Sequence, residues 1–175
     1  MIHLAVLLLL IATPATAQTC TLTLSIRTEA IHGAHPEGTS LQAELTFTPT
    51  RRMRMGAEAT AYLTDGTVQI TGPDGTGLTG RLGVVHIVRA PHWADYMSFD
   101  IVDVAGDLGG VTDYEDPMLL SFYAERGEVA SFNLPTTQAA FDQFDRRQTF
   151  QVHTPDTMWT LPGSVHDPSL TCEPT

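Results

Sequence analysis

Lysine is absent from this chain of 175 residues, and its nine basic residues are all arginines, against 20 Asp and Glu. The absence of lysine excludes Schiff-base and lysine-base chemistry, because both need an amine that can lose its proton. A formal net charge of -11 argues against binding to nucleic acid or to anionic membranes, because both need clustered positive charge. With 42% hydrophobic residues, the composition is that of a packed globular protein.

Recognisable catalytic motifs are absent from the sequence as well. It contains no G-x-S-x-G, no H-E-x-x-H, no phosphate-binding loop and no dinucleotide-binding pattern. Beyond the amino-terminal region, no hydrophobic run approaches the length of a transmembrane helix, so we expect no later membrane span. These absences favour a non-enzymatic protein that binds a ligand or has a structural role.

Residues 1–17 have the features of a secretory signal peptide. The apolar run from Leu4 to Ala12 has the length of a signal-peptide core, and Ala15-Thr16-Ala17 supplies a small-x-small cleavage pattern. The run is too short for the alternative, an uncleaved membrane anchor. We therefore expect cleavage before Gln18, a single domain over residues 18–175, and a location in the periplasm or outside the cell.

Only two cysteines are present, and they lie near the two ends of the mature chain. In an exported protein, Cys20 and Cys172 are most simply explained as a disulfide. Such a bond requires the two ends of the domain to lie side by side. The alternative for Cys20 is a lipid anchor, but the preceding Gln18-Thr19 lacks the small residue that normally comes before an acylated cysteine.

Alternation of apolar and polar residues dominates the mature sequence. Residues 21–26 and 41–47 each place apolar side chains on one face, the pattern of half-buried antiparallel strands. Asp65-Gly66 between two apolar runs predicts a hairpin turn, and the Gly-rich segment 72–77 predicts a loop. The expected strands cover residues 21–26, 41–47, 59–63, 68–70, 82–89, 96–104, 118–124, 128–134, 148–153 and 157–162.

A short helix is expected near residues 136–145. Thr136 or Thr137 can cap it, and Phe141 and Phe144 fall on one face. With about nine or ten short strands and turns rich in Gly and Pro, the predicted fold is an all-β antiparallel β-sandwich or jelly roll. A closed barrel is the second choice.

Charge is unevenly placed along the chain. Between Arg89 and Arg126 lie eight acidic residues and no basic one. An acidic loop rich in Gly can wrap around Ca²⁺, which takes about six to eight oxygen ligands. The candidate ligands are Asp107, Asp113, Glu115 and Asp116. Their spacing matches no EF-hand, and the alternative is a solvated acidic face that keeps the protein soluble.

The segment at residues 91–96 concentrates side chains with flat faces and hydrogen-bonding groups. The candidate binding residues are His92, Trp93, Asp95 and Tyr96. Such a loop can stack on sugar rings or hold a protein partner, so an unknown carbohydrate or protein is the expected partner. In the alternative interpretation, Trp93 packs over one end of the core. The second functional hypothesis is a carbohydrate-active or other hydrolase that uses Asp or Glu carboxylates with His92.

Overall fold

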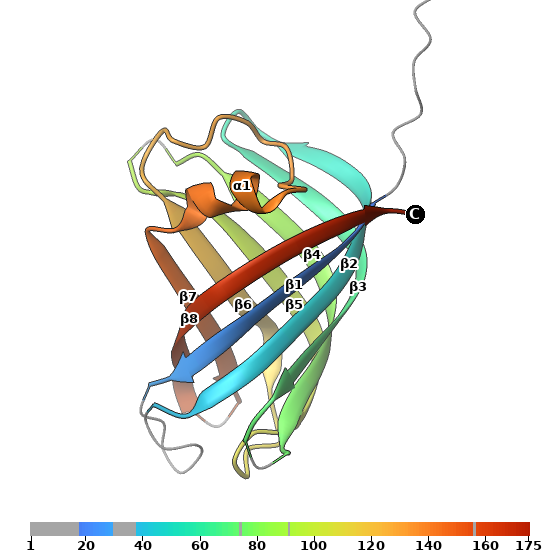
Figure 1. Ribbon diagram of the computed structural model, residues 1–175. Coiled ribbons are helices and arrows are strands. Elements are labelled where there is room, and N and C mark those ends of the chain that lie inside the picture. The colour runs from blue at the N-terminus through green and yellow to red at the C-terminus, as the bar shows by residue number, and fades with distance from the viewer. Residues whose placement is uncertain (1–17, 30–37, 74, 91, 156) are drawn as a thin grey trace, which may run out of the picture.

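The computed structural model describes residues 18–29, 38–73, 75–90, 92–155 and 157–175, so the leader predicted over residues 1–17 lies outside the described residues. Within them, each strand pairs antiparallel with the next, and the last pairs with the first (Figure 1). The strands are β1 (Gln18–Thr28), β2 (Ser40–Met55), β3 (Ala59–Thr71), β4 (Gly77–Val88), β5 (Asp95–Asp107), β6 (Glu115–Ala124), β7 (Arg147–Thr154) and β8 (Thr157–Pro174). No helix in this part of the chain is long and apolar enough to cross a membrane.

This closed barrel of eight strands corrects the predicted sandwich or jelly roll of nine or ten. The first error is at Asp65-Gly66, which makes no turn and lies inside β3. A Cβ at Gly66 would lie 2.6 Å from the backbone oxygen of Thr46 and 2.7 Å from the Cβ of Phe47. The register between β3 and β4 shifts at the same place. Gly66 therefore allows β2 to approach β3 closely at the register shift, and it does not reverse the chain.

The second error is the strand predicted over residues 128–134, which form a loop at the end of the barrel that also carries the helix (Figure 1). The Tyr62 hydroxyl ties this loop to the wall: it donates to the Phe132 carbonyl at 2.7 Å and accepts from the Leu134 N–H at 3.2 Å. Val129 is buried in the core, and Phe132 and Leu134 pack against it. The apolar pattern therefore reflects burial without a strand partner.

The predicted helix is confirmed as α1 (Gln138–Phe141) followed by the 3₁₀ turn η1 (Asp142–Phe144). The Thr137 side chain caps it by accepting from the Ala140 N–H at 3.3 Å. Gln138 fixes the helix to β8, because its side chain donates to the Pro168 carbonyl at 3.2 Å and accepts from the Leu170 N–H at 2.6 Å. We call this end of the barrel the capped end.

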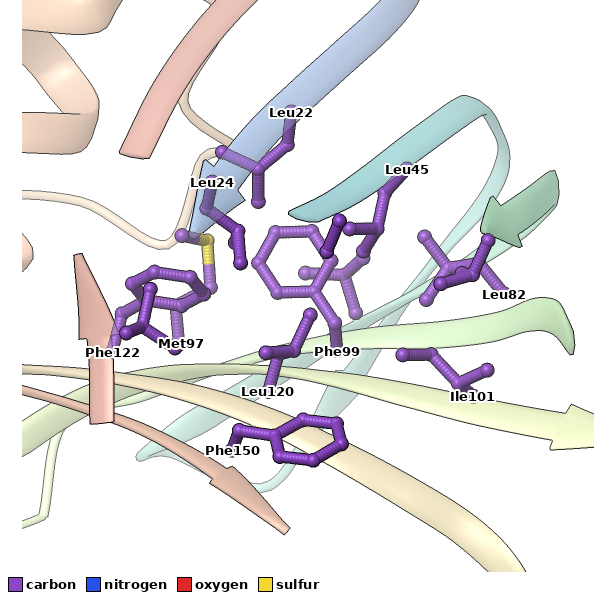
Figure 2. Close-up of a cluster of buried hydrophobic side chains, with 14 of the residues drawn as sticks. Leu22, Leu24, Leu45, Leu82, Met97, Phe99, Ile101, Leu120, Phe122 and Phe150 are labelled. Atoms are coloured by element: carbon purple, nitrogen blue, oxygen red, sulfur yellow. The ribbon is translucent and has the colours of Figure 1, made fainter. Parts of the chain in front are cut away.

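Apolar side chains from all eight strands fill the barrel interior, part of which is drawn in Figure 2. A series of edge-to-face ring contacts runs from β2 to the helix. The ring centroids lie 5.7 Å apart for Phe47 and Phe99, 5.7 Å for Phe99 and Phe122, and 5.0 Å for Phe122 and Phe141. Phe141 and Phe144 are both 1% exposed, so the helix closes the core with the face that the sequence predicts.

A disulfide joins the first and last strands, as predicted. Cys20 on β1 and Cys172 on β8 are direct neighbours in the ladder, with their Cα atoms 4.0 Å apart. The bond closes a loop that spans 152 residues. In the chain-entropy model, a loop of this size stabilises the folded state by about 5 kcal/mol.

Candidate functional site

Four side chains form a row across the outer wall at the capped end. In register, Val88 on β4 faces Tyr96 on β5, Tyr96 faces Tyr123 on β6, and Tyr123 faces Arg147 on β7. Side chains alternate between the two faces of a strand, and the adjacent Phe122 is fully buried inside the barrel. Tyr123 and its row are therefore directed outward.

This row lines a cleft of about 680 Å³, together with residues from the β4–β5 loop and the start of β7. The other lining residues are Ala90, Trp93, Ala94 and Arg146. The volume falls in the range of small-molecule sites, roughly 300–1,000 Å³. Trp93 is 79% exposed, whereas an aromatic side chain of this size is usually largely buried. We call this cleft, with its eight lining residues, the aromatic cleft.

Two tyrosines make the floor of the aromatic cleft. The rings of Tyr96 and Tyr123 are 5.8 Å apart, centroid to centroid, and are tilted by 41°. Burial raises the pKa of the Tyr96 phenol above its usual value, and the neighbouring Tyr123 and Asp100 add to the effect. A tyrosine hydroxyl is protonated at neutral pH even without this shift, so Tyr96 can donate a hydrogen bond to a ligand.

Two arginines stand at one side of the tyrosines. The guanidinium of Arg147 lies over the Tyr123 ring, 6.0 Å from its centroid, in cation–π geometry. Arg146 Nη1 donates to Glu125 Oε2 at 2.9 Å. The Arg146 backbone N–H donates to the Tyr123 carbonyl at 2.9 Å, which fixes the start of β7 beside the end of β6.

The four binding residues predicted from the sequence have different positions in the structure. Trp93 and Tyr96 both line the aromatic cleft, and Trp93 is not packed over the core as the alternative interpretation expected. His92 is exposed and lies outside the lining. Asp95 is 1% exposed and accepts from the N–H groups of Gly127 and Val129, at 3.0 and 3.2 Å. Asp95 therefore anchors the capped end instead of facing a ligand.

Sequence reasoning missed Tyr123, Arg146 and Arg147. One signal was available: in the strand that contains Leu120 and Phe122, Tyr123 has the opposite phase and must face outward. Tyr123 contacts Tyr96 only because of the register between β5 and β6. The alternation within a single strand does not determine that register.

The four carboxylates predicted to bind calcium lie at the opposite end of the barrel. Among the described residues, no three His, Cys, Asp or Glu side chains come together as a metal site. Asp116 accepts from the N–H groups of Asp103 and Val104, at 2.9 and 3.3 Å, and Asp107 accepts from the Gly110 N–H at 2.6 Å. These two carboxylates hold backbone in place. Asp113 and Glu115 are exposed, and calcium binding stays a prediction.

A second polar group lies on the outer wall, next to the row that lines the aromatic cleft. Asp100 is at its centre: one oxygen is 3.2 Å from His86 Nε2, and the other accepts from the Ser98 hydroxyl at 3.2 Å. Nucleophilic catalysis needs the histidine between the serine and the carboxylate, so that the imidazole can take the hydroxyl proton. Here the carboxylate occupies the middle position, and the arrangement supports a structural role.

A comparison with protein-family models, with curated proteins and with solved structures finds no match for this chain.

Proposed function

We propose that this protein is an exported, non-enzymatic binding module that holds a small ligand in the aromatic cleft. The observation that carries the proposal is the strongly exposed Trp93 beside the outward row of Tyr96, Tyr123 and Arg147. A large apolar ring that stays in water lacks the favourable free energy of burial. A ligand that covers Trp93 therefore gains binding free energy. The disulfide and the predicted leader support an oxidising compartment, the periplasm or the cell exterior.

The chemistry of the aromatic cleft favours binding over hydrolysis. Its lining contains no Asp, Glu or His, and glycoside hydrolysis needs a pair of carboxyl groups on either side of the bond to be cleaved. The ionisable groups that do line the cleft are tyrosines and arginines. Tyrosine and arginine supply stacking, hydrogen-bond donors and positive charge, which are the functions of a binding site.

A thermal-shift screen of the disulfide-bonded protein tests the proposal, with neutral oligosaccharides, acidic oligosaccharides and aromatic acids as probes. We expect at least one probe to raise the unfolding midpoint by about 2 °C or more at saturation. The gain should be lost in Trp93→Ala and kept in the control Met55→Ala, because Met55 is 51% exposed and outside the cleft. If no probe stabilises the protein, or if mass spectrometry finds the probe cleaved, the proposal is wrong.

A further inference from the structure

Positively charged side chains line the aromatic cleft, although the protein as a whole is strongly acidic. The chain carries 20 acidic residues and nine arginines, yet two of those arginines and no carboxylate line the cleft. Opposite charge in a ligand is attracted most strongly over short distances, because salt screens charges beyond about 8 Å at physiological ionic strength. The local pair of arginines, and not the net charge of -11, therefore determines which ligand charge the cleft favours.

Arg147 is positioned to bind an oxyanion. Its guanidinium carbon lies 6.0 Å from the centre of the Tyr123 ring, and among the described residues Arg147 has no carboxylate partner. The N–H groups of such a guanidinium can form two parallel hydrogen bonds to a carboxylate. Contact with the ring also restricts the side chain before the ligand arrives, which lowers the entropy cost of binding.

Arg146 adds a second, weaker positive group. Its bond to Glu125 is on the surface, with side chains 49% and 57% exposed, so the pair stays hydrated and only partly neutralised. One guanidinium nitrogen is used by Glu125, and the remaining N–H groups can reach a ligand. The two consecutive arginines thus place hydrogen-bond donors along one side of the tyrosines.

The aromatic side chains of the cleft supply a second kind of contact, with the apolar part of a ligand. Trp93, Tyr96 and Tyr123 line a cleft on the surface of the barrel that is open to solvent. Exposed aromatic faces suit the apolar faces of sugar rings, which are also hydrated on their edges. A ring ligand that carries a carboxylate satisfies both the aromatic faces and the arginines.

We propose that the aromatic cleft binds an acidic carbohydrate, with a uronic acid ring on the aromatic side chains and its carboxylate on Arg147. This inference rests on the proposed function, because it names the ligand class of the same cleft. Trp93 supplies contact area for any sugar, and Arg147 selects for the acidic one. The two contributions are separable, because they act on different parts of the ligand.

Isothermal titration calorimetry tests the inference, with a galacturonic acid trimer and a galactose trimer of the same linkage as probes. We expect the acidic trimer to bind at least about 10-fold more tightly, because hydrogen bonds between two charged groups are the strong ones. Arg147→Gln should remove most of that preference, because it weakens the acidic trimer much more than the neutral one. Trp93→Ala should weaken both trimers by about 10-fold.

Two further variants make the test specific. Arg51→Gln removes an equal charge from an exposed residue at the capped end outside the cleft, and we expect it to leave both affinities unchanged. Arg147→Lys keeps the charge but loses the planar donor pair, so it should recover less than half of the lost preference. Wild-type thermal midpoints in both Arg147 variants show that the fold is intact.

The remaining outcomes separate the ligand class from the proposed function. If both trimers bind equally and both depend on Trp93, the protein is a binding module but the acidic ligand class is wrong. If an aromatic acid such as benzoate binds more tightly than both trimers, the carbohydrate assignment is wrong. If neither trimer binds and the thermal-shift screen also finds no ligand, the proposed function itself fails.

Discussion

The two ends of the barrel use charged side chains in opposite ways. The segments 51–60, 88–96 and 123–147, at the capped end, hold seven of the nine arginines. Three of these arginines lie over aromatic rings, those of Tyr62, Phe132 and Tyr123. Residues 103–116, at the other end, hold five carboxylates and no arginine. We call this second end the acidic end.

Carboxylates at the acidic end mainly shape its turns, whereas two of the arginines at the capped end line a cleft. Asp107 and Asp116 accept backbone N–H groups, and Asp103 pairs with Arg81 at 2.9 Å. At the capped end, Arg146 and Arg147 face the aromatic cleft. A high density of one charge in a sequence therefore need not mark the binding site. Here the scarce residue, arginine, is the more informative one.

Truncating Phe141, which closes the core at the capped end, should have the largest effect on stability. Phe141 is 1% exposed and contacts Phe122, so Phe141→Ala should lower the free energy of unfolding by about 4 kcal/mol. The matched change at the acidic end, Leu108→Ala, removes a fully buried but smaller side chain and should cost about 2 kcal/mol. Urea unfolding measures both values, and an equal or larger loss for Leu108→Ala would contradict the comparison.

Two aspartates provide a matched test of burial, because each holds two backbone N–H groups of a neighbouring segment. Asp95 does so at 1% exposure, and Asp116 does so in an exposed position. We expect Asp95→Ala to cost about 2–3 kcal/mol, because it leaves the buried Val129 N–H without its acceptor. Asp116→Ala should cost about 1 kcal/mol or less, because water replaces the carboxylate. Urea unfolding of both variants at pH 7 measures the two losses in the free energy of unfolding. An equal loss for the two variants would contradict the role given to burial.

Tyrosine ionisation at the acidic end gives a smaller, pH-dependent effect. Burial raises the pKa of Tyr114 to about 12, and Asp107 adds to this, whereas the hydrogen bond from the Leu108 N–H lowers it in part. The folded protein therefore holds this proton more tightly than the unfolded chain, whose tyrosine pKa is about 10. The resulting stability is complete below pH 10 and is lost as the pH rises toward 12.

Tyr114→Phe tests this linkage. At pH 7 the variant should be about 1 kcal/mol less stable, because the hydroxyl also donates to the Val111 carbonyl. The difference between wild type and variant should shrink as the pH rises from 10 to 12, in urea unfolding series at each pH. A constant difference over that interval would show that Tyr114 does not titrate with the raised pKa.

Calcium should have the smallest effect. Because Asp107 and Asp116 are engaged by backbone N–H groups, we expect the thermal midpoint to change by less than about 1 °C at millimolar calcium. Magnesium at equal ionic strength controls for screening. A rise of several degrees with calcium alone would support the cation site that the sequence predicts, and would make the acidic end a second functional region.

Residue type and spacing predict several features of the fold, whereas the pairing and bending of strands depend on contacts that no single segment specifies. The disulfide, the helix with Phe141 inward and the alternation of β1 all follow from residue type and spacing. The prediction failed at Asp65-Gly66, where the same dipeptide suits a hairpin turn and a close strand approach. Only the position of Phe47, on the neighbouring strand, distinguishes the two.

The candidate site shows the same division. Trp93 and Tyr96 lie three positions apart in one short segment, so the sequence alone predicts both as candidate binding residues. Tyr123 and Arg147 join them only through the pairing of β5 with β6 and of β6 with β7. Asp95 was chosen for its place beside Trp93, but the strand alternation that turns Tyr96 outward turns Asp95 inward. Strand phase, applied to each candidate, would have removed it.

The order of the strands has a consequence for when the chain can fold. β8 is the neighbour of both β7 and β1, and it also exchanges two hydrogen bonds with the Gln138 side chain, which fix the helix. The barrel therefore cannot close during synthesis until the final strand has left the ribosome, because its first strand waits for a partner about 150 residues away. Until then, the edges of β1 and β7 that β8 will cover present unpaired backbone N–H and C=O groups, with which a strand of another chain can pair.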